Sequence, residues 1–316
     1  MNKVRVGVIG VGYLGQFHAE KYARMPDVEL VGVVDADPAR LAQIAGKLGT
    51  QAFREPSDLL GKVDAVNIAV PTVLHHGIAK QFLAAHVHIL LEKPITVTLS
   101  QADELIDLAD RNGVVLQIGH IERFNPAVIA VKERITSTRY MTAERAAPFT
   151  VRCTDVNVVL DLMIHDLDIA SDMAGSAPRE VSAAGASIIT KEIDTASARI
   201  VFQNGCIADV SASRISDEKV RLLRVFDEAH MFVADYQTQK ANIFQKGDTS
   251  TPELISHDIS LERRDTLAEE IRAFVKCVRD GNRPLVSGIE GRRALLLAQI
   301  ITENIEKGKS GFTSMP

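Results

Sequence analysis

Aromatic side chains are scarce in this sequence, which has no tryptophan, 4 tyrosines and 11 phenylalanines among 316 residues. Proteins that stack nucleobases or bare sugar rings need aromatic platforms, and few are available here. Charge is balanced as well, with 36 lysines and arginines against 41 aspartates and glutamates and a net charge of -5. Because there is no basic surplus, we expect no nucleic-acid partner. A small-molecule ligand would be held mainly by main-chain groups, charges and aliphatic side chains.

Cysteines and long apolar runs are equally rare. Cys153, Cys206 and Cys277 lie far apart without a CxxC pair, so we expect neither a disulfide framework nor a metal site. No segment approaches the roughly 18 uninterrupted apolar residues of a membrane helix. The chain starts with Met1, Asn2 and Lys3 and enters an apolar strand without the pattern of a signal peptide. These features predict a cytoplasmic protein with reduced cysteines that does not bind membranes.

A glycine-rich turn lies near the start of the chain. An apolar run at residues 4–9 is followed by Gly10, Gly12 and Gly15 and then by a helical pattern through about residue 25. In a dinucleotide-binding turn, the first glycine permits the tight turn and the second lets the main chain approach a pyrophosphate. The third lets the helix pack closely on the strand, and the helix N-terminus directs N–H groups at the phosphates. The sequence therefore predicts a dinucleotide cofactor.

Asp35 ends the next apolar run, 20 positions beyond Gly15. A carboxylate at this distance accepts hydrogen bonds from the adenosine ribose and repels a 2'-phosphate. The cofactor is therefore expected to be NAD. Arg40, a turn further on, keeps NADP open as an alternative.

Strands and helices are predicted to alternate through the first 120 residues. The strands are apolar throughout, as in a parallel sheet that is buried on both faces, so we expect a doubly wound α/β fold there. Ligands of such sheets bind beyond the carboxyl ends of the strands. The expected helices span residues 38–48, 74–85 and 99–111, and the expected strands span residues 65–70, 87–91 and 114–118.

A lysine follows the strand at residues 87–91, at the edge where the cofactor would bind. Pro94 disfavours helical geometry for Lys93 and keeps the main chain extended. A lysine in this place can hydrogen bond a substrate hydroxyl or share in proton transfer. On spacing alone, a surface pair of Glu92 and Lys93 is the better explanation. The other side chains expected at this edge are Asp35, Thr72, His75 and His120.

A helix is expected at residues 158–173, with apolar side chains on two sides and a polar stripe between them. Such a helix is largely buried. Asp161 and His165 are four residues apart and adjacent on the stripe, so the carboxylate can orient the imidazole and raise its basicity. This arrangement predicts a general base with its orienting group, with a purely structural histidine as the alternative. The stripe consists of Asp161, His165, Asp168 and Asp172.

From about residue 179 the pattern changes to period two, which predicts an antiparallel sheet with a hairpin at Gln203, Asn204 and Gly205. One face of this sheet needs cover, and we expect a homodimer or homotetramer to supply it. The polar segment 246–258 is expected to be a loop. Strands are expected at residues 180–187, 195–202, 206–212, 220–226 and 231–236, and helices at residues 265–279 and 289–307, which Gly281 and Gly308 would stop.

Four motifs occur together along the chain. They are the glycine turn at residues 10–15 with His18, the stretch at residues 69–75, the Glu92-Lys93-Pro94 triplet, and the Asp161 to His165 pair. This combination resembles the glucose-fructose oxidoreductase and inositol dehydrogenase (Gfo/Idh/MocA) family, over nearly the whole chain. The resemblance implies a Rossmann domain for NAD at residues 1–120 and an α+β domain for substrate binding and oligomerisation at residues 121–316, with an open antiparallel sheet.

Two further stretches, residues 119–126 and 154–166, are similar to the subgroup that oxidises the 3-hydroxyl of UDP-N-acetylglucosamine or its uronic acid ahead of an aminotransferase. That resemblance implies a role in the synthesis of 3-amino sugars for lipid A or surface polysaccharides. Inositol and glucose dehydrogenases of the family often carry two glycines before the Asp–His helix, where this chain has Thr154, Asp155, Val156 and Asn157. A nucleotide-sugar substrate is therefore favoured over a simple polyol.

The resemblance implies catalytic roles for Lys93, His165 and Asp161. A UDP-sugar needs arginine partners for its pyrophosphate, and we consider Arg123, Arg152 and Arg214. The substrate-binding residues are expected to be Lys93, Arg123, Asn125, Arg152, Asp155, Asp161 and His165. The cofactor-binding residues are expected to be Gly10, Gly12, Tyr13, Leu14, Gly15, Asp35, Val70, Pro71, Thr72, His75, Glu92, Lys93 and His120.

Two alternatives remain at this point. One is a free-sugar or inositol dehydrogenase of the same fold. The other is a non-catalytic NAD-binding regulator, against which the retention of Lys93, Asp161 and His165 argues, because a sensor needs no oriented base.

Overall fold

The computed structural model describes residues 3–151, 156–247 and 252–310, with side chains as far as residue 308. The chain forms two compact units, Met1–Ile121 with Asp265–Arg292, and Glu122–Arg264 with Arg293–Pro316. The division expected from the sequence had assigned Asp265–Arg292 to the second part. In the structure this segment joins the first unit because Ile271, Phe274 and Val275 pack into its core.

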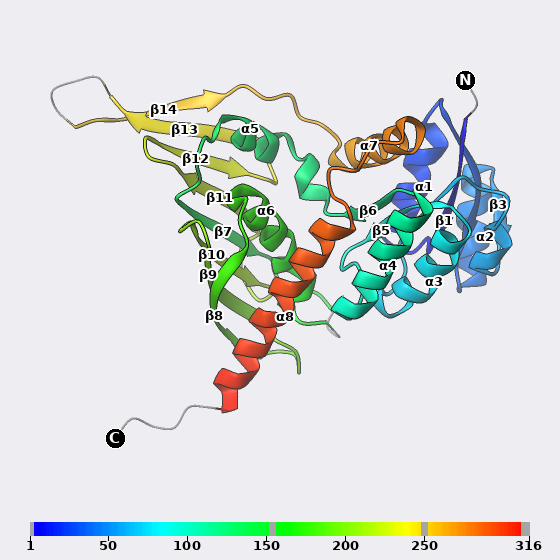
Figure 1. Ribbon diagram of the computed structural model, residues 1–316, viewed down its shortest axis with the longest axis horizontal. Coiled ribbons are helices and arrows are strands. Elements are labelled where there is room, and N and C mark those ends of the chain that lie inside the picture. The colour runs from blue at the N-terminus through cyan, green and yellow to red at the C-terminus, as the bar shows by residue number, and fades with distance from the viewer. Residues whose placement is uncertain (1–2, 152–155, 248–251, 311–316) are drawn as a thin grey trace. The chain divides into compact units, whose positions relative to one another are not determined.

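The first unit contains a six-stranded parallel sheet in the order β3-β2-β1-β4-β5-β6, which is the doubly wound order of dinucleotide-binding domains. This confirms the predicted fold class for this part of the chain (Figure 1). The strands are β1 (Val4–Ile9), β2 (Val28–Val34), β3 (Gln51–Phe53), β4 (Ala65–Ile68), β5 (His88–Glu92) and β6 (Leu116–Gly119). The helices are α1 (Gly15–Arg24), α2 (Pro38–Leu48), η1 (Pro56–Leu59), α3 (Thr72–Ala84), α4 (Leu99–Asn112) and α7 (Thr266–Asp280).

One face of this sheet is covered by α1, α2 and α7. Side chains of β1 such as Val6 and Val8 pack there against Tyr22, Leu41 and Phe274. The helix boundaries follow from local sequence. Proline at the first helical position and the Asp37 cap begin α2, and glycines in the left-handed conformation end α2 and α4.

The second unit is built on an eight-stranded sheet in the order β14-β13-β12-β11-β7-β10-β9-β8. Neighbouring strands are antiparallel except β7 and β10, which are parallel. The strands are β7 (Tyr140–Ala146), β8 (Pro178–Ala186), β9 (Thr195–Phe202), β10 (Ile207–Ser213), β11 (Val220–Phe226), β12 (His230–Asp235), β13 (Lys240–Lys246) and β14 (Leu254–Ile259). The helices are η2 (Ile121–Phe124), α5 (Pro126–Arg134), η3 (Val159–Met163), α6 (Ile164–Ala174) and α8 (Gly288–Ser310), which enters this unit at Arg293.

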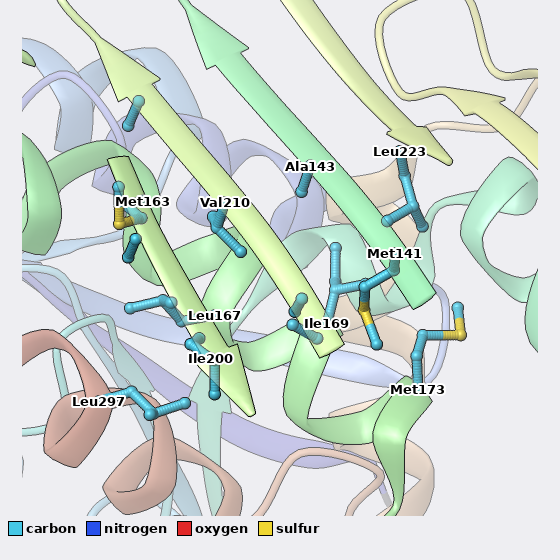
Figure 2. Close-up of a cluster of buried hydrophobic side chains, with 14 of the residues drawn as sticks. Met141, Ala143, Met163, Leu167, Ile169, Met173, Ile200, Val210, Leu223 and Leu297 are labelled. Atoms are coloured by element: carbon cyan, nitrogen blue, oxygen red, sulfur yellow. The ribbon is translucent and has the colours of Figure 1, made fainter. Parts of the chain in front are cut away.

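The core of the second unit lies between one face of its sheet and the helices α5, η3, α6 and α8. Alternate strand residues point into it, as in the pattern of β9, where every second side chain is buried. Figure 2 shows part of this core, with Leu167 of α6, Ile200 of β9 and Leu297 of α8 among the labelled side chains. The period-two pattern of the sequence therefore identified the sheet and five of its eight strands, β8 to β12, but not β7, β13 or β14.

Three expectations for the second unit were wrong. Residues 246–258 are not simply a loop, because β14 pairs with β13 as an exposed edge strand whose weak apolar pattern hides it from sequence analysis. Gly308 does not stop the last helix, which continues to Ser310. The helix expected at residues 158–173 is not one continuous α-helix, since it begins with the π-helical turn η3.

Among the described residues, no helix is long and apolar enough to cross a membrane. Within the same ranges, no three histidine, cysteine, aspartate or glutamate side chains are grouped so that they could hold a metal ion. Cys206 and Cys277 are free.

Candidate active site

The glycine turn between β1 and α1 is shaped as its sequence predicts. Gly10 has a φ of +86°, and a Cβ there would lie 2.5 Å from the carbonyl oxygen of Ala69. A Cβ on Gly15 would lie 1.8 Å from the Gly10 carbonyl oxygen, so neither position tolerates a side chain. At Gly12 the nearest atom to such a Cβ is a guanidinium nitrogen of Arg40 at 3.8 Å. The main chain at Gly12 is therefore open to a ligand, and the turn fits a pyrophosphate.

Asp35 stands directly after β2 and is tied to this turn. One carboxylate oxygen accepts the Val11 N–H at 2.9 Å, and the other accepts the Asp37 N–H at 2.9 Å. A guanidinium nitrogen of Arg40 lies 3.6 Å from the Asp35 carboxylate. Because each carboxylate oxygen has two lone pairs, Asp35 can accept further hydrogen bonds from the hydroxyls of a ribose.

A cavity of about 1260 Å³ opens beside these residues. Its volume is ample for a dinucleotide half. Of the residues predicted to bind the cofactor, five line it: Gly10, Gly12, Asp35, Val70 and Pro71. Tyr13 and Leu14 are exposed on the turn, and Gly15 packs closely against the main chain of Gly10.

His75 on α3 joins two loops at the carboxyl edge of the sheet. Its Nδ1 lies 2.8 Å from the carbonyl oxygen of Pro94, and its Nε2 lies 2.9 Å from the carbonyl oxygen of Val70. The ring is buried, and burial lowers the pKa of His75 despite these two carbonyls. Because both ring nitrogens already face main-chain oxygens, the structure favours a bridging role over the direct cofactor contact expected for His75.

Glu92 ends β5 and Lys93 follows it, joined to Pro94 by a cis peptide. Glu92 turns inward and lies 3.0 Å from Nε2 of His18 on α1. The sequence associated His18 with the glycine turn but did not predict this buried pair. The other residues expected at this edge are Thr72, which begins α3, and His120, which is buried after β6.

The proposed base lies in the second unit, just after a π-helical turn. Asp161 belongs to η3, whose π-type hydrogen bond runs from the N–H of Ile164 to the carbonyl oxygen of Val159, and His165 is the second residue of α6. Both side chains are partly exposed, whereas the flanking Met163 is fully buried. Widened turns of this kind occur often at functional sites, and nothing in the helical periodicity indicates one.

A buried charge cluster holds the first turn of α6. Asp166, the residue after His165, accepts two hydrogen bonds from Arg145 of β7, and Arg145 also donates to Glu122 at 3.0 Å. Arg221 lies 3.4 Å from Glu122. Burial raises the pKa of Asp166, although Arg145 opposes the change. An aspartate on an apolar side of a helix was the one sequence signal that could have revealed this cluster.

Two residues expected to bind substrate are engaged within the second unit. Arg123 is buried and pairs with Asp168 at 3.5 Å and Asp172 at 3.0 Å. Asn125 caps α5 by accepting the Ala127 N–H, and its amide donates to Glu122 and to the carbonyl oxygen of Tyr236. These contacts favour structural roles for both. Arg214 is buried and donates to the carbonyl oxygen of Val156, and the candidates Arg152 and Asp155 lie outside the described residues.

Comparison with known proteins agrees with this geometry. The model of an oxidoreductase family with an NAD-binding Rossmann fold matches residues 4–120, and the model of the GFO/IDH/MocA C-terminal domain matches residues 133–232. UDP-N-acetylglucosamine 3-dehydrogenase from Acidithiobacillus ferrooxidans is 37% identical over 97% of this chain and 98% of its own length. Myo-inositol 2-dehydrogenase from Thermotoga maritima is 29% identical over 97% of this chain and 98% of its own length.

Solved structures give the same result. A structure of the Acidithiobacillus ferrooxidans UDP-N-acetylglucosamine 3-dehydrogenase covers 97% of this chain and 99% of its own, with a TM-score of 0.92 and 37% identity. The family match over residues 4–120 covers the glycine turn, Asp35 and all six strands of the parallel sheet. The chain belongs to the Gfo/Idh/MocA family of oxidoreductases, whose N-terminal domain binds NAD.

Proposed function

We propose that this protein oxidises the 3-hydroxyl of UDP-N-acetylglucosamine, or of a closely related UDP-amino sugar, to the 3-keto sugar with NAD as the oxidant. The observation that carries the proposal is the 37% identity, over 97% of the chain, to a UDP-N-acetylglucosamine 3-dehydrogenase. The motifs agree with it, because the chain keeps Lys93 and the Asp161 and His165 pair. A regulator without catalytic activity would need none of these side chains.

In the proposed site, the main chain at Gly10 and Gly12 and the N-terminus of α1 hold the cofactor pyrophosphate. Asp35 accepts the ribose hydroxyls. When bound, NAD supplies the hydride acceptor. Asp35 also disfavours a 2'-phosphate by charge repulsion, which supports NAD over NADP.

The remaining roles belong to the side chains that would act on the sugar. His165 accepts the proton of the 3-hydroxyl at one of its ring nitrogens, and Asp161 orients the imidazole and stabilises its charged form. The ammonium group of Lys93 hydrogen bonds the same hydroxyl oxygen, which polarises the O–H bond. Candidates for contact with the rest of the substrate include Arg152 and Asp155, together with Arg123 and Asn125 if their internal contacts open on binding.

The product, a 3-keto sugar nucleotide, is the natural substrate of an aminotransferase. We propose that such an enzyme consumes it in the synthesis of 3-amino sugars for lipid A or surface polysaccharides. Free Cys206 and Cys277 support a reducing, cytoplasmic location. The face of the second sheet away from its helices carries half-buried apolar side chains such as Tyr140, Leu222 and Phe226. We propose that a second copy covers this face in a homodimer or homotetramer.

An assay of NADH formation tests the substrate. The purified full-length protein is incubated with NAD and, in separate reactions, with UDP-N-acetylglucosamine, its uronic acid, a panel of free sugars, and myo- and scyllo-inositol. We expect turnover with the UDP-sugars and a kcat/KM at least about a hundredfold lower with the others, because binding to the nucleotide contributes to the reaction.

Preference for an inositol would instead establish the second candidate function, which the 29% identity to myo-inositol 2-dehydrogenase favours. Tight NAD binding without turnover of any compound in the panel would contradict both enzymatic functions and would favour the regulator.

A further inference from the structure

Two buried amide side chains lie on the face of the first sheet that α1 and α7 cover, one bonded to each of these helices. Asn67 of β4 pairs in register with Leu90 of β5, and Leu90 pairs with Gln117 of β6, so the three side chains lie in one row on one face. Asn67 and Gln117 are both fully buried. Strands of a parallel sheet are normally apolar on both faces, so polar groups at this level need a physical explanation.

The next row toward the carboxyl edge contains Glu92 and Gly119. Glu92 lies two residues beyond Leu90 and therefore points to the same face, and it pairs in register with Gly119. A Cβ on Gly119 would lie 3.0 Å from a carboxylate oxygen of Glu92. Gly119 thus leaves the space into which the Glu92 carboxylate turns.

His18 connects both rows to α1. Its Nε2 lies 3.0 Å from the Glu92 carboxylate, and its Nδ1 lies 2.7 Å from the side-chain oxygen of Asn67. Tyr22, one turn further along α1, directs its hydroxyl at the same Asn67 oxygen at 3.5 Å. His18 and Tyr22 are buried. The end of β5 is therefore fixed to a helix that starts at the cofactor turn.

A second carboxyl faces this network from α7. Gln117 donates to the carbonyl oxygen of Glu270, whose side chain is fully buried. Burial and the charge of Glu92 raise the pKa of Glu270 well above its usual range. Burial also acts to raise the pKa of Glu92, but the hydrogen bond and charge of His18, and then the charges of Lys93 and His75, outweigh it and lower that pKa. The negative charge of the network thus belongs to Glu92.

We propose that Glu92 is a positioning residue for Lys93. Its carboxylate is held by His18 and lies against Gly119, which fixes the main chain at the end of β5, directly before Lys93. The chain thereby directs Lys93 to the hydroxyl of the substrate. This inference rests on the proposed function, in which Lys93 contacts that hydroxyl, and it assigns Glu92 to the support of Lys93 in place of the direct cofactor contact expected from the sequence.

Glu92→Gln and His18→Gln test the proposal in the full-length protein, because each keeps a hydrogen-bonding side chain of similar reach and removes the pairing. A displacement of Lys93 by about 1 Å should lower kcat on the order of a hundredfold, with KM for NAD changed by less than about threefold. The matched controls are Glu104→Gln and His76→Gln, since His76 and Glu104 form a histidine–glutamate pair at 2.7 Å outside the network. We expect both controls to retain wild-type kcat.

A double-mutant cycle with Lys93→Met separates positioning from general damage. If Glu92 acts through Lys93, Glu92→Gln should change kcat by less than about twofold when Lys93 is already methionine. Losses that add in full would overturn the proposal, because they would show that Glu92 acts independently of Lys93. The cycle uses whichever compound of the panel the wild-type protein oxidises, so an unexpected substrate refutes the proposed function without affecting this result.

Hydrogen exchange followed by mass spectrometry gives a readout that needs no substrate. Loss of an ionic hydrogen bond should speed exchange in the peptide that spans residues 92–96 by about tenfold or more in both network variants. Peptides from α2 and both controls should exchange at the wild-type rate. Unchanged exchange at residues 92–96 in both variants would overturn the proposal even if the chain had no activity with the panel.

Discussion

Arg145 holds Asp166 through two hydrogen bonds, from Nε to one carboxylate oxygen at 2.6 Å and from Nη2 to the other at 3.1 Å. Both side chains are buried, and Glu122 completes the cluster. Asp166 follows His165 directly in the first turn of α6. The geometry of the proposed base therefore depends on a bidentate contact with a neighbouring strand.

Arg145→Met should lower the free energy of unfolding by about 3–5 kcal/mol, because it leaves Asp166 buried without its arginine partner and leaves Glu122 with Arg221 alone. Arg145→Lys keeps the charge but loses the planar fork, and we expect a smaller loss of about 1–3 kcal/mol together with a lower kcat. Urea unfolding and steady-state kinetics measure these effects. As a control, Arg139→Met removes an exposed arginine paired with Glu228 and should cost less than about 1 kcal/mol. Equal losses in Arg145→Met and Arg139→Met would contradict this account.

His165→Ala should lower kcat by about a hundred- to ten-thousandfold, because the hydroxyl proton loses its acceptor. Lys93→Met should lower kcat by a similar factor. NADH binding, followed by fluorescence, should be nearly unchanged in His165→Ala. His257→Ala, at an exposed histidine of β14, serves as the matched control. Unchanged turnover of the true substrate in His165→Ala and Lys93→Met would refute the assigned roles.

Glu270→Gln should stabilise the protein at neutral pH. The folded chain retains the Glu270 proton where the unfolded chain has released it, since burial and then Glu92 raise the pKa of Glu270. The stability that this proton contributes is present below pH 4.5, the ordinary value, and is lost as the pH rises toward the raised value. The advantage of Glu270→Gln should therefore grow by about 1.4 kcal/mol per pH unit above that point.

Urea unfolding of both proteins between pH 4 and pH 8 measures this difference. Glu253→Gln, which replaces an exposed glutamate, should show a difference from wild type that does not depend on pH. A constant difference for Glu270→Gln would mean that Glu270 is ionised in the folded chain.

Asp35→Ser should raise the ratio of kcat/KM for NADP to that for NAD by about tenfold or more, equal to about 1.4 kcal/mol. The substitution removes the charge that repels a 2'-phosphate, and Arg40 lines the same cavity and can then pair with that phosphate. Adding Arg40→Ala should reverse most of the gain. If Asp35→Ser lowers kcat/KM for NAD and for NADP by the same factor, Asp35 acts mainly by accepting hydrogen bonds from the N–H groups of Val11 and Asp37.

The parts of the site that depend on local sequence were predictable. Gly10, Gly15 and Asp35 act through turn geometry and spacing, and the structure places them as expected. Period two likewise identified β9 and β11 to the residue. These signals lie within a few residues of the features that they predict.

The contacts between distant segments were not predictable. His18 meets Glu92, and Arg145 meets Asp166, only because the sheets bring them together. For the same reason, Arg123 and Asn125 were expected to face a substrate. In the structure Arg123 pairs with Asp168 and Asp172. Asn125 donates to the carbonyl oxygen of Tyr236. α7 belongs to the first unit because Phe274 is buried in the core of that unit. An amphipathic helix could bury its apolar side against many surfaces, so its sequence does not show which unit it joins.

The two-part composition of the first unit has a consequence for synthesis on the ribosome. Phe274 and Ile271 complete the core beneath β1, yet everything from Glu122 to Arg264 is translated between Ile121 and this helix. The part of the Rossmann core that α7 covers must therefore remain exposed until residues 266–280 have been translated. Chaperones that shield exposed apolar surface would have their longest opportunity on this protein during that interval.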